Sequence, residues 1–153
     1  MRIAIASDHA GFIIKDDIIN LVQDLGHEVN DLGTFDQEPV DYPDSAEKAG
    51  KIIQNDLADR AIILCGSGVG VCIAANKMKG IYAGTCHDTY SAHQGVEHDN
   101  MNVLCLGARI IGAELAKEIV TAFLNAKFSQ EDRHKRRVGK VIELETKGTI
   151  STH

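Results

Sequence analysis

The sequence predicts an α/β protein in which helices cover both faces of a five-stranded parallel sheet. Short β-rich apolar runs alternate along the chain with longer segments whose apolar residues recur at helical spacing, as in successive β-loop-α units. One run, residues 60–64, is so apolar that we expect it to be buried on both faces, as central strands of parallel sheets are. Strands that alternate with helices predict a three-layer α/β/α arrangement of the Rossmann-like, doubly wound kind.

The individual elements follow from the same two periodicities. The apolar β-rich runs predict strands at residues 2–6, 28–32, 60–64, 81–85 and 103–106. Apolar residues at helical spacing predict helices at residues 12–25, about 45–56, 69–76, 112–125 and about 132–146. Gly26 is placed to end the first helix, and Asp132 is placed to cap the last. The polar stretch 87–102 separates the last two strands, and its first part is compatible with a helix.

The length and the charge predict a single domain that binds a small ligand. A chain of 153 residues, expected to form one unit over 1–153, can bury a core without disulfides or a metal. Its formal net charge of −6 argues against a nucleic-acid or anionic-membrane partner, because such partners attract a positive protein surface. No apolar run approaches the length of a membrane span.

The N-terminal segment and the cysteines predict a cytoplasmic location. The chain starts with an alternating apolar run and lacks the basic region and cleavage site of a signal peptide. Cys65, Cys72, Cys86 and Cys105 lie in different segments and form no CxxC pair. We therefore expect free thiols in a reducing compartment.

A cysteine followed by three glycines in alternate positions stands between a predicted strand and a predicted helix, in the stretch CGSGVG at residues 65–70. Backbone N–H groups in such a loop can hold an oxyanion at the positive end of the helix. A helix N-terminus also lowers the pKa of a nearby thiol from about 8.5 toward neutrality, so Cys65 is a candidate base or nucleophile. The plainer alternative is a tight turn with a buried cysteine. Cys72, Cys86 and Cys105 fall in apolar surroundings, and we expect them in the core.

Two further polar residues follow the first predicted strand. Asp8 and His9 should project over the same sheet edge as Cys65, because the carboxyl ends of parallel strands meet there. They are candidates for an acid–base pair, and the alternative is an exposed loop or a helix cap. The histidines of the stretch 87–102 resemble a metal cluster only superficially, because their spacing matches no ligand pattern. We therefore expect no metal.

The only strongly basic run is RHKRR at residues 133–137. On a helix Arg133 and Arg137 lie four residues apart on one face, where two guanidinium groups can converge on a phosphate. A solvated charged face is the ordinary interpretation of such a run. The scarcity of acidic residues beside it favours an anion site.

Five stretches of the chain resemble those of one known family. They are SDHAG at 7–11, VDYPD at 40–44, CGSGVGVCIAANK at 65–77, NVLCLGARIIG at 102–112 and RHKRR at 133–137. In this order and spacing they resemble the sugar-phosphate isomerase family that includes ribose-5-phosphate isomerase B and the galactose-6-phosphate isomerase subunits. The resemblance implies a metal-free aldose–ketose isomerase that needs no cofactor and works through a cis-enediolate.

The resemblance also implies catalytic roles. Cys65 is similar to the base that moves a proton between C1 and C2 of the sugar, and His98 to the acid that opens the sugar ring, aided by Asp8. Ser67 stands where its hydroxyl can serve the enediolate oxygens. The amides expected to stabilise the negative oxygen are those of Gly66, Ser67, Gly68, Val69 and Gly70.

Sugar and phosphate contacts are implied for His9, Arg109, Arg133 and Arg137. One position departs from the family, which commonly reads HND or HNN after the ring-opening histidine, whereas this chain reads His98-Asp99-Asn100. Asp99 therefore places a carboxylate where the family has an amide that contacts the substrate. Such a carboxylate repels an anionic ligand unless it is neutralised.

The family forms dimers, some of which pair into tetramers, and the histidine loop of one subunit completes the site of the other. The resemblance thus implies a homodimer or homotetramer with shared sites. We expect the interface at the apolar segment 103–111 and the C-terminal helix.

Three functions remain compatible with the sequence. The first is interconversion of ribose 5-phosphate and ribulose 5-phosphate, and the second is the same chemistry on a six-carbon substrate such as allose or galactose 6-phosphate. We expect the loop 86–100 to set the pocket length that separates these two. The third is a non-catalytic protein that binds a sugar phosphate, which would not need Cys65, His98 and Asp8 together.

Overall fold

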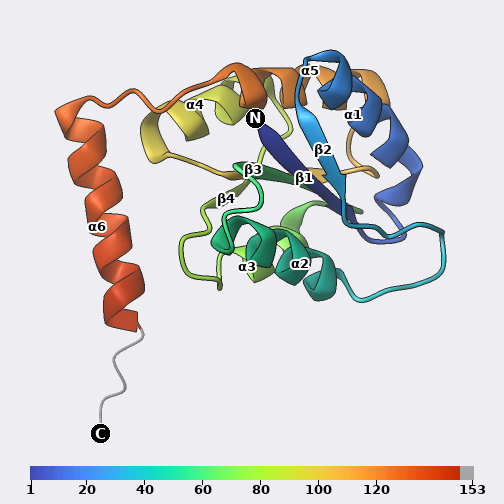
Figure 1. Cartoon of the computed structure of the whole chain (residues 1–153), viewed down its shortest axis with the longest axis horizontal. Helices are drawn as coiled ribbons and strands as arrows, with labels where there is room; N and C mark the ends of the chain where they lie inside the picture. The colour runs from blue at the N-terminus through green and yellow to red at the C-terminus, as the bar shows by residue number, and fades with distance from the viewer. Residues whose placement is uncertain (149–153) are drawn as a thin grey trace, which may run out of the picture.

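The computed structural model describes residues 1–148 and confirms the predicted fold class (Figure 1). Its five parallel strands lie in the order β2-β1-β3-β5-β4, so β3 is the central strand. The strands are β1 (Arg2–Ser7), β2 (Glu28–Asp31), β3 (Arg60–Cys65), β4 (Ala83–Thr85) and β5 (Val103–Gly107).

Six helices accompany the sheet within the described residues. They are α1 (Phe12–Asp24), α2 (Tyr42–Gln54), α3 (Val69–Ala75), α4 (Thr89–Asp99), α5 (Ala113–Asn125) and α6 (Asp132–Gly148). Figure 1 shows α1, α4 and α5 on one face of the sheet and α2 and α3 on the other. None of these helices is both long and apolar enough to cross a bilayer.

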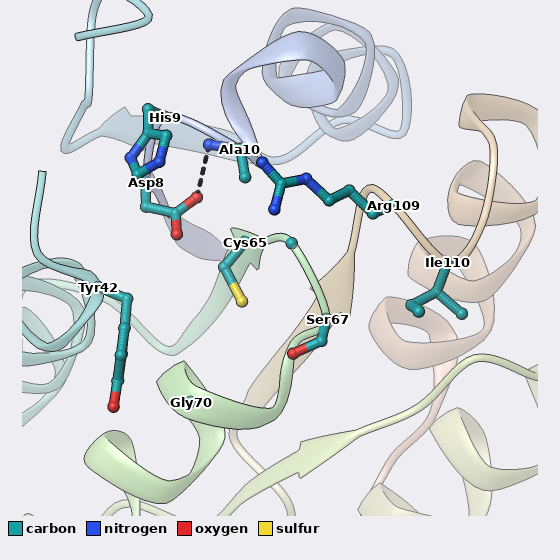
Figure 2. A pocket seen from close by; sticks show the side chains of 10 residues that line it. Asp8, His9, Ala10, Tyr42, Cys65, Ser67, Gly70, Arg109 and Ile110 are labelled. Carbon is teal, nitrogen blue, oxygen red and sulfur yellow. Dashed lines mark hydrogen bonds between the residues drawn. The ribbon is translucent and has the colours of Figure 1, made fainter. Parts of the chain in front are cut away.

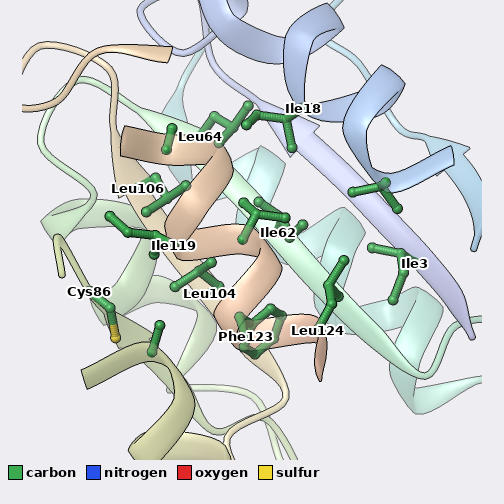
Figure 3. Packing of buried hydrophobic residues seen from close by; sticks show 14 of the residues in the cluster. Ile3, Ile18, Ile62, Leu64, Cys86, Leu104, Leu106, Ile119, Phe123 and Leu124 are labelled. Atoms are coloured by element: carbon green, nitrogen blue, oxygen red, sulfur yellow. The ribbon is translucent and has the colours of Figure 1, made fainter. Parts of the chain in front are cut away.

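The two faces of the sheet carry side chains of different size. On the face toward α5, the buried side chains of Ile62 and Leu104 pack around Phe123 (Figure 3). The opposite face presents small residues such as Ala4 and Ala61, which allow α2 and α3 to approach closely. Burial of each large apolar side chain contributes about 2 kcal/mol. The α1/α5 face therefore supplies most of the hydrophobic stabilisation.

Several boundaries differ from those predicted. Helix α2 begins at Tyr42 rather than near residue 45, because Pro43 occupies its first turn, where the missing N–H is not needed. Strand β4 is shorter than predicted and begins at Ala83, since the side chain of Asn102 takes the N–H of Tyr82 at 2.8 Å. Asp132 is the first residue of α6 and not its cap.

The polar stretch after β4 contains an ordered helix. The carboxylate of Asp88 accepts a hydrogen bond from the backbone N–H of Ser91 at 2.6 Å and caps α4. The left-handed residue Asn100 (φ 54°) ends the helix, and asparagine tolerates this conformation better than most residues. The segment expected as a loop at 86–100 is therefore mostly helical.

The apolar segment 103–111 does not form an exposed surface, and the prediction that it supplies an interface is wrong for most of its length. The four residues from Val103 to Leu106 are completely buried, because β5 lies between β3 and β4 in the sheet of its own chain. An apolar run is equally compatible with a core strand and an interface, and here it is the core. Only Ile110, which is 59% exposed, remains available on this segment among large apolar residues.

Helix α6 projects from the body at one end of the long axis of the molecule (Figure 1). It is attached through contacts with α4 and through a hydrogen bond from the N–H of Gly80 to the carboxylate of Glu145, at 2.8 Å. Its apolar residues Val141, Ile142 and Leu144 are exposed.

Candidate active site

The carboxyl ends of β1, β3 and β5 surround a cavity of about 420 Å³ (Figure 2). This is the edge of a parallel sheet at which ligands generally bind. The residues that line the cavity are Asp8, His9, Ala10, Tyr42, Cys65, Gly66, Ser67, Gly70, Arg109 and Ile110. Four segments that are far apart in the sequence therefore contribute to one pocket.

Cys65 ends the central strand, and its sulfur faces the glycine turn. The backbone N–H of Gly68 donates to its Sγ at 3.0 Å. The side chain is almost buried, at 5% exposure, yet it lines the cavity, and Figure 2 shows the sulfur directed into this space. A donor at this distance stabilises negative charge on sulfur. The sulfur is thus held against the turn and accessible to a molecule bound in the cavity.

The glycine turn is tightly packed at Gly68. This residue has φ +79°, and a Cβ there would lie 3.0 Å from the Cγ2 of Thr85 and 3.1 Å from the carbonyl carbon of Leu106. Glycine is therefore required both for the left-handed backbone and for the space. The Thr85 hydroxyl donates to the Gly68 carbonyl at 2.9 Å and holds the turn in place.

Two amides of the turn have acceptors within the turn itself. The N–H of Gly68 points at Cys65, and the N–H of Val69 donates to the hydroxyl oxygen of Ser67 at 3.2 Å. Because that hydroxyl accepts this bond, its own hydrogen is available to donate to a ligand. Ser67 thus presents a donor to the cavity.

Arg109 is placed by the backbone of the glycine turn. The carbonyl of Cys65 accepts from the N–H of Ala108 at 2.8 Å, and the carbonyl of Gly66 accepts from the N–H of Arg109 at 3.0 Å. These bonds hold the segment after β5 against the turn, and Figure 2 shows the Arg109 guanidinium extended toward Ala10. Within residues 1–148, no carboxylate pairs with this guanidinium. It is therefore available for an anion.

The Asp8 carboxylate accepts hydrogen bonds from the backbone and also lines the cavity. Its Oδ1 accepts from the N–H groups of Ala10 and Gly11, both at 2.9 Å, at the start of α1. These bonds form a turn ahead of α1, whose N-cap residue is Gly11 and has no side-chain cap, so the predicted alternative of a helix cap is wrong for Asp8. The carboxylate nevertheless lines the cavity, although the residue is only 7% exposed. Asp8 is thus a rigidly held carboxylate at the edge of the pocket.

His9 is oriented by the loop that follows β2. The backbone N–H of Val40 lies 3.2 Å from Nδ1 of the ring. Because Nδ1 must accept this bond, the proton of the neutral imidazole is assigned to Nε2. His9 therefore has a ring N–H left as a donor.

The prediction missed three residues that line the pocket, Ala10, Tyr42 and Ile110. The Tyr42 ring packs over Gly70, where a Cβ would lie 2.8 Å from the ring. An aromatic residue directly before Pro43, near a sheet edge, was the available signal for Tyr42. No sequence pattern distinguishes Ile110 from a core residue.

Four predicted site residues lie away from the pocket of their own chain. His98 and Asp99 are at the end of α4, whereas Arg133 and Arg137 are in the first turns of α6. None of the four lines the cavity that contains Cys65. Asp99 instead lines a separate cavity of about 310 Å³, beside Cys86 and Met101.

The other cysteines differ in environment. Cys86 and Cys105 are buried as expected, but Cys72 is only partly buried. A hydrogen bond between Cys72 and Cys105 lowers the pKa of Cys72 to about 6, and the same bond together with burial raises that of Cys105. Burial raises the pKa of Cys86 to about 11. Cys86 and Cys105 are therefore inert thiols of the core.

The histidine-rich stretch does not assemble a ligand set. Nδ1 of His93 pairs with the carboxylate of Glu97 at 3.2 Å, and its ring meets Tyr90 edge-on. Nε2 of His87 accepts from the N–H of Gly107 at 2.9 Å. In the part of the chain that the structure describes, no group of three or more His, Cys, Asp or Glu side chains could hold a metal ion.

Comparison with known proteins places these features in one family. A family model described as "Ribose/Galactose Isomerase" matches residues 3–141. The chain is 42% identical over 144 residues to ribose-5-phosphate isomerase B of Escherichia coli, covering 94% of this chain and 96% of that protein. It is 44% identical over 131 residues to D-erythrulose-4-phosphate isomerase of Pectobacterium atrosepticum, covering 84% and 85%.

Solved structures agree with this similarity. Ribose-5-phosphate isomerase B of Clostridium thermocellum superposes with a TM-score of 0.94 at 43% identity, covering 97% of this chain and 100% of that one. The enzyme of Thermotoga maritima gives 0.89 at 46% identity, covering 93% and 97%.

Proposed function

The chain belongs to the ribose/galactose isomerase family of aldose–ketose isomerases, and we propose that it interconverts ribose 5-phosphate and ribulose 5-phosphate through a cis-enediolate. The observation that carries this proposal is the position of Cys65. Its sulfur lies at the end of the central strand, receives the N–H of Gly68 and lines the same cavity as Asp8, His9 and Arg109.

Cys65 is the base in this proposal. Its thiolate takes the proton from C2 of the open-chain aldose, and the electron pair of that C–H bond forms the C1–C2 double bond while the carbonyl oxygen becomes negative. Return of the proton to C1, with transfer of the hydroxyl proton between the two oxygens, gives the ketose. Such a reaction needs a base that is ionised near neutral pH and a prearranged environment for the negative oxygen.

The glycine turn supplies that environment. The resemblance implies that the amides from Gly66 to Gly70 serve this purpose, but those of Gly68 and Val69 already donate to Cys65 and Ser67. The amides of Gly66, Ser67 and Gly70 and the hydroxyl hydrogen of Ser67 therefore stabilise the enediolate oxygens in this proposal. The turn is held by the Thr85 and Arg109 bonds, so its donors require little rearrangement when charge develops.

Ring opening uses His98 as the acid that protonates the ring oxygen, with Asp8 aiding removal of the hydroxyl proton at C1. Because His98 lies away from the pocket of its own chain, we propose that a second copy of the chain supplies it in a homodimer, alone or within a tetramer. Asp99, Arg133 and Arg137 come with it, because they occupy the same α4 and α6 ends.

The phosphate group is held by His9 and Arg109 of one chain and by the arginines of the other. His9 offers its Nε2 hydrogen, and Arg109 has no carboxylate partner within residues 1–148. Arg133 contacts Glu131 at 2.9 Å in the isolated chain and would exchange this exposed pair for the phosphate. Energy from this remote contact aligns the reacting carbons. All four cysteines are free thiols, which supports a cytoplasmic location.

Two other substrate lengths have specific support. The family name includes galactose, which favours a six-carbon alternative such as allose or galactose 6-phosphate, and the relative from Pectobacterium is named for a four-carbon substrate. In this proposal the second chain brings the Asp99 carboxylate to the substrate, where the family commonly has an amide.

A turnover panel with four-, five- and six-carbon aldose phosphates tests the proposal. We expect the highest kcat/KM for ribose 5-phosphate. A higher value for erythrose 4-phosphate or for a hexose 6-phosphate would reassign the substrate and leave the isomerase chemistry intact. Absence of turnover with every member of the panel would refute the proposed substrate class.

A further inference from the structure

A second histidine lies against the proposed ring-opening acid. The rings of His98 and His134 stack with centroids 4.1 Å apart and planes inclined by 25°. His134 is 2% exposed, whereas the charged residues around it on α6 are on the surface. A buried imidazole on a helix that is otherwise mostly polar indicates a specific role for the ring.

The position of His134 is fixed from two sides. Its Nδ1 lies 2.5 Å from the hydroxyl of Ser129, and its backbone N–H donates to the carbonyl of Glu131 at 2.9 Å. The N–H of Ser129 in turn donates to the carbonyl of Glu97, the residue before His98, at 2.9 Å. The stack therefore belongs to a hydrogen-bonded connection between the last turn of α4 and the first turn of α6.

The surroundings of His134 disfavour its protonated form. Burial, followed by the positive potential of His98 and Arg133, lowers its pKa. The charged or titratable groups that face it are His98 from α4, Glu131 before α6, and Arg133 and Arg137 on α6 itself. Two protonated imidazoles in a stack repel one another. The lowered pKa of His134 therefore limits this repulsion within the stack.

We propose that His134 is a positioning residue for His98: its buried ring fixes the plane of the acid imidazole and joins it to the arginine-bearing end of α6. The acid and the phosphate-binding arginines then reach the substrate as one prearranged unit. This inference rests on the proposed function, in which His98 opens the sugar ring. It assigns His134 no contact with the substrate.

A double-mutant cycle on the purified full-length enzyme tests the proposal. We expect His98→Ala to lower kcat for ribose 5-phosphate at least about 100-fold, as for loss of a general acid. His134→Ala should lower kcat about 10-fold through misplacement of His98, with KM changed less than about threefold. In the His98→Ala background, His134→Ala should lower kcat less than about twofold, because the residue through which it acts is already absent.

A conservative variant separates orientation from general stability. His134→Phe keeps a flat buried ring, so we expect it to restore most of the kcat lost in His134→Ala, with thermal unfolding and oligomeric state measured for each variant. His93→Ala is the matched control on α4, because His93 does not touch His98, and its kcat should stay within about twofold of the wild type.

Each outcome separates the two claims. Wild-type turnover in His98→Ala would refute the ring-opening role itself. If His98→Ala lowers kcat as expected, but His134→Ala lowers kcat by the same factor in that variant as in the wild type, only the positioning role would be overturned. A folded His134→Phe as slow as His134→Ala, or a raised KM with unchanged kcat, would also overturn it, because a ring nitrogen or phosphate binding would then be the function of His134.

Discussion

The proposed active site is divided between two regions that are built in different ways. The first, here called the strand-end region, consists of the residues that line the cavity at the ends of β1, β3 and β5, and backbone hydrogen bonds to the sheet hold it. The second, here called the helix-end region, consists of His98, Asp99, Arg133, His134 and Arg137, where α4 meets α6 at the opposite end of the molecule.

The two regions contribute to different steps of the proposed reaction. In the proposed mechanism, the strand-end region supplies the base and its donors, which must be positioned precisely because proton transfer depends steeply on distance. In the same proposal, the helix-end region supplies long side chains for the phosphate and one ring that delivers a proton. Helix α6 is attached to the rest of its chain mainly through α4 and the Gly80–Glu145 bond, and in the proposal a second chain places this region over the substrate. Variants should therefore behave differently in the two regions.

The largest effect is expected at the base. Cys65→Ala should lower kcat by at least about 10³-fold, because the variant lacks the proposed base at C2, while the Kd for ribose 5-phosphate changes less than about threefold. Turnover and isothermal titration calorimetry measure the two quantities. Cys72→Ala is the control, since this partly buried thiol lies outside the cavity, and it should keep turnover within about threefold. Full activity in Cys65→Ala would remove the thiol from the mechanism.

Mixing two inactive variants tests whether the regions come from different chains. When Cys65→Ala and His98→Ala subunits are refolded together, half of the dimers are mixed and each contains one intact site, so turnover should recover to about a quarter of the wild-type value. Cys65→Ala mixed with the Cys65→Ala/His98→Ala double variant is the control, because no intact site can form. If both mixtures stay inactive while mixed dimers are present, each site belongs to one chain.

Two glycine substitutions, one in the turn beside the strand-end region and one in α6 next to the helix-end region, should have opposite effects on stability. Gly68→Ala forces a Cβ into a left-handed turn and against Thr85, so we expect a loss of about 2 kcal/mol in unfolding free energy and about 10-fold in kcat. Gly139→Ala in α6 meets nothing within 4 Å and should stabilise the helix by about 0.5–1 kcal/mol. Thermal unfolding and turnover measure both. Equal behaviour of the two variants would contradict the contrast in packing.

The smallest expected effect is a pH dependence of stability in the helix-end region. The pKa of His134 is lowered from its ordinary value of 6.5, so the unfolded chain binds more protons than the folded one just below that pH. Stability should therefore fall as the pH decreases below about 6.5, and less steeply in His134→Phe. The Asp59 carboxylate, whose pKa Arg2 lowers from 3.8, contributes only at more acidic pH. Thermal unfolding of the wild type and of His134→Phe from pH 7 to pH 5 checks this. An identical dependence of stability on pH in the two proteins would contradict it.

The sequence was most informative where local pattern reports burial. The apolar runs located every strand, because both faces of a parallel sheet are covered, and the strand ends identified Asp8, His9 and Cys65. Helix α4 was less evident, since its buried face includes only Ala92 and Val96. A polar segment with so few apolar residues has a weak helical pattern.

Contacts between distant segments could not be derived in the same way. Tyr42 lines the pocket because its ring meets Gly70, and His98 stacks on a ring 36 positions later in the chain. No periodicity encodes either contact. Strand β5 shows the same limit. Its apolar residues are compatible with both a core strand and an interface, and the order of the strands in the sheet decides between the two.

The two outer strands of the sheet also restrict how copies of the chain can associate. Strand β4 has three residues, and β2 has four, two of which are the acidic Glu28 and Asp31. Short or charged edges offer a poor template for an added strand, which protects the sheet from edge-to-edge aggregation. Association between copies is thereby directed to helices and loops, where side chains rather than backbone ladders decide which surfaces recognise each other.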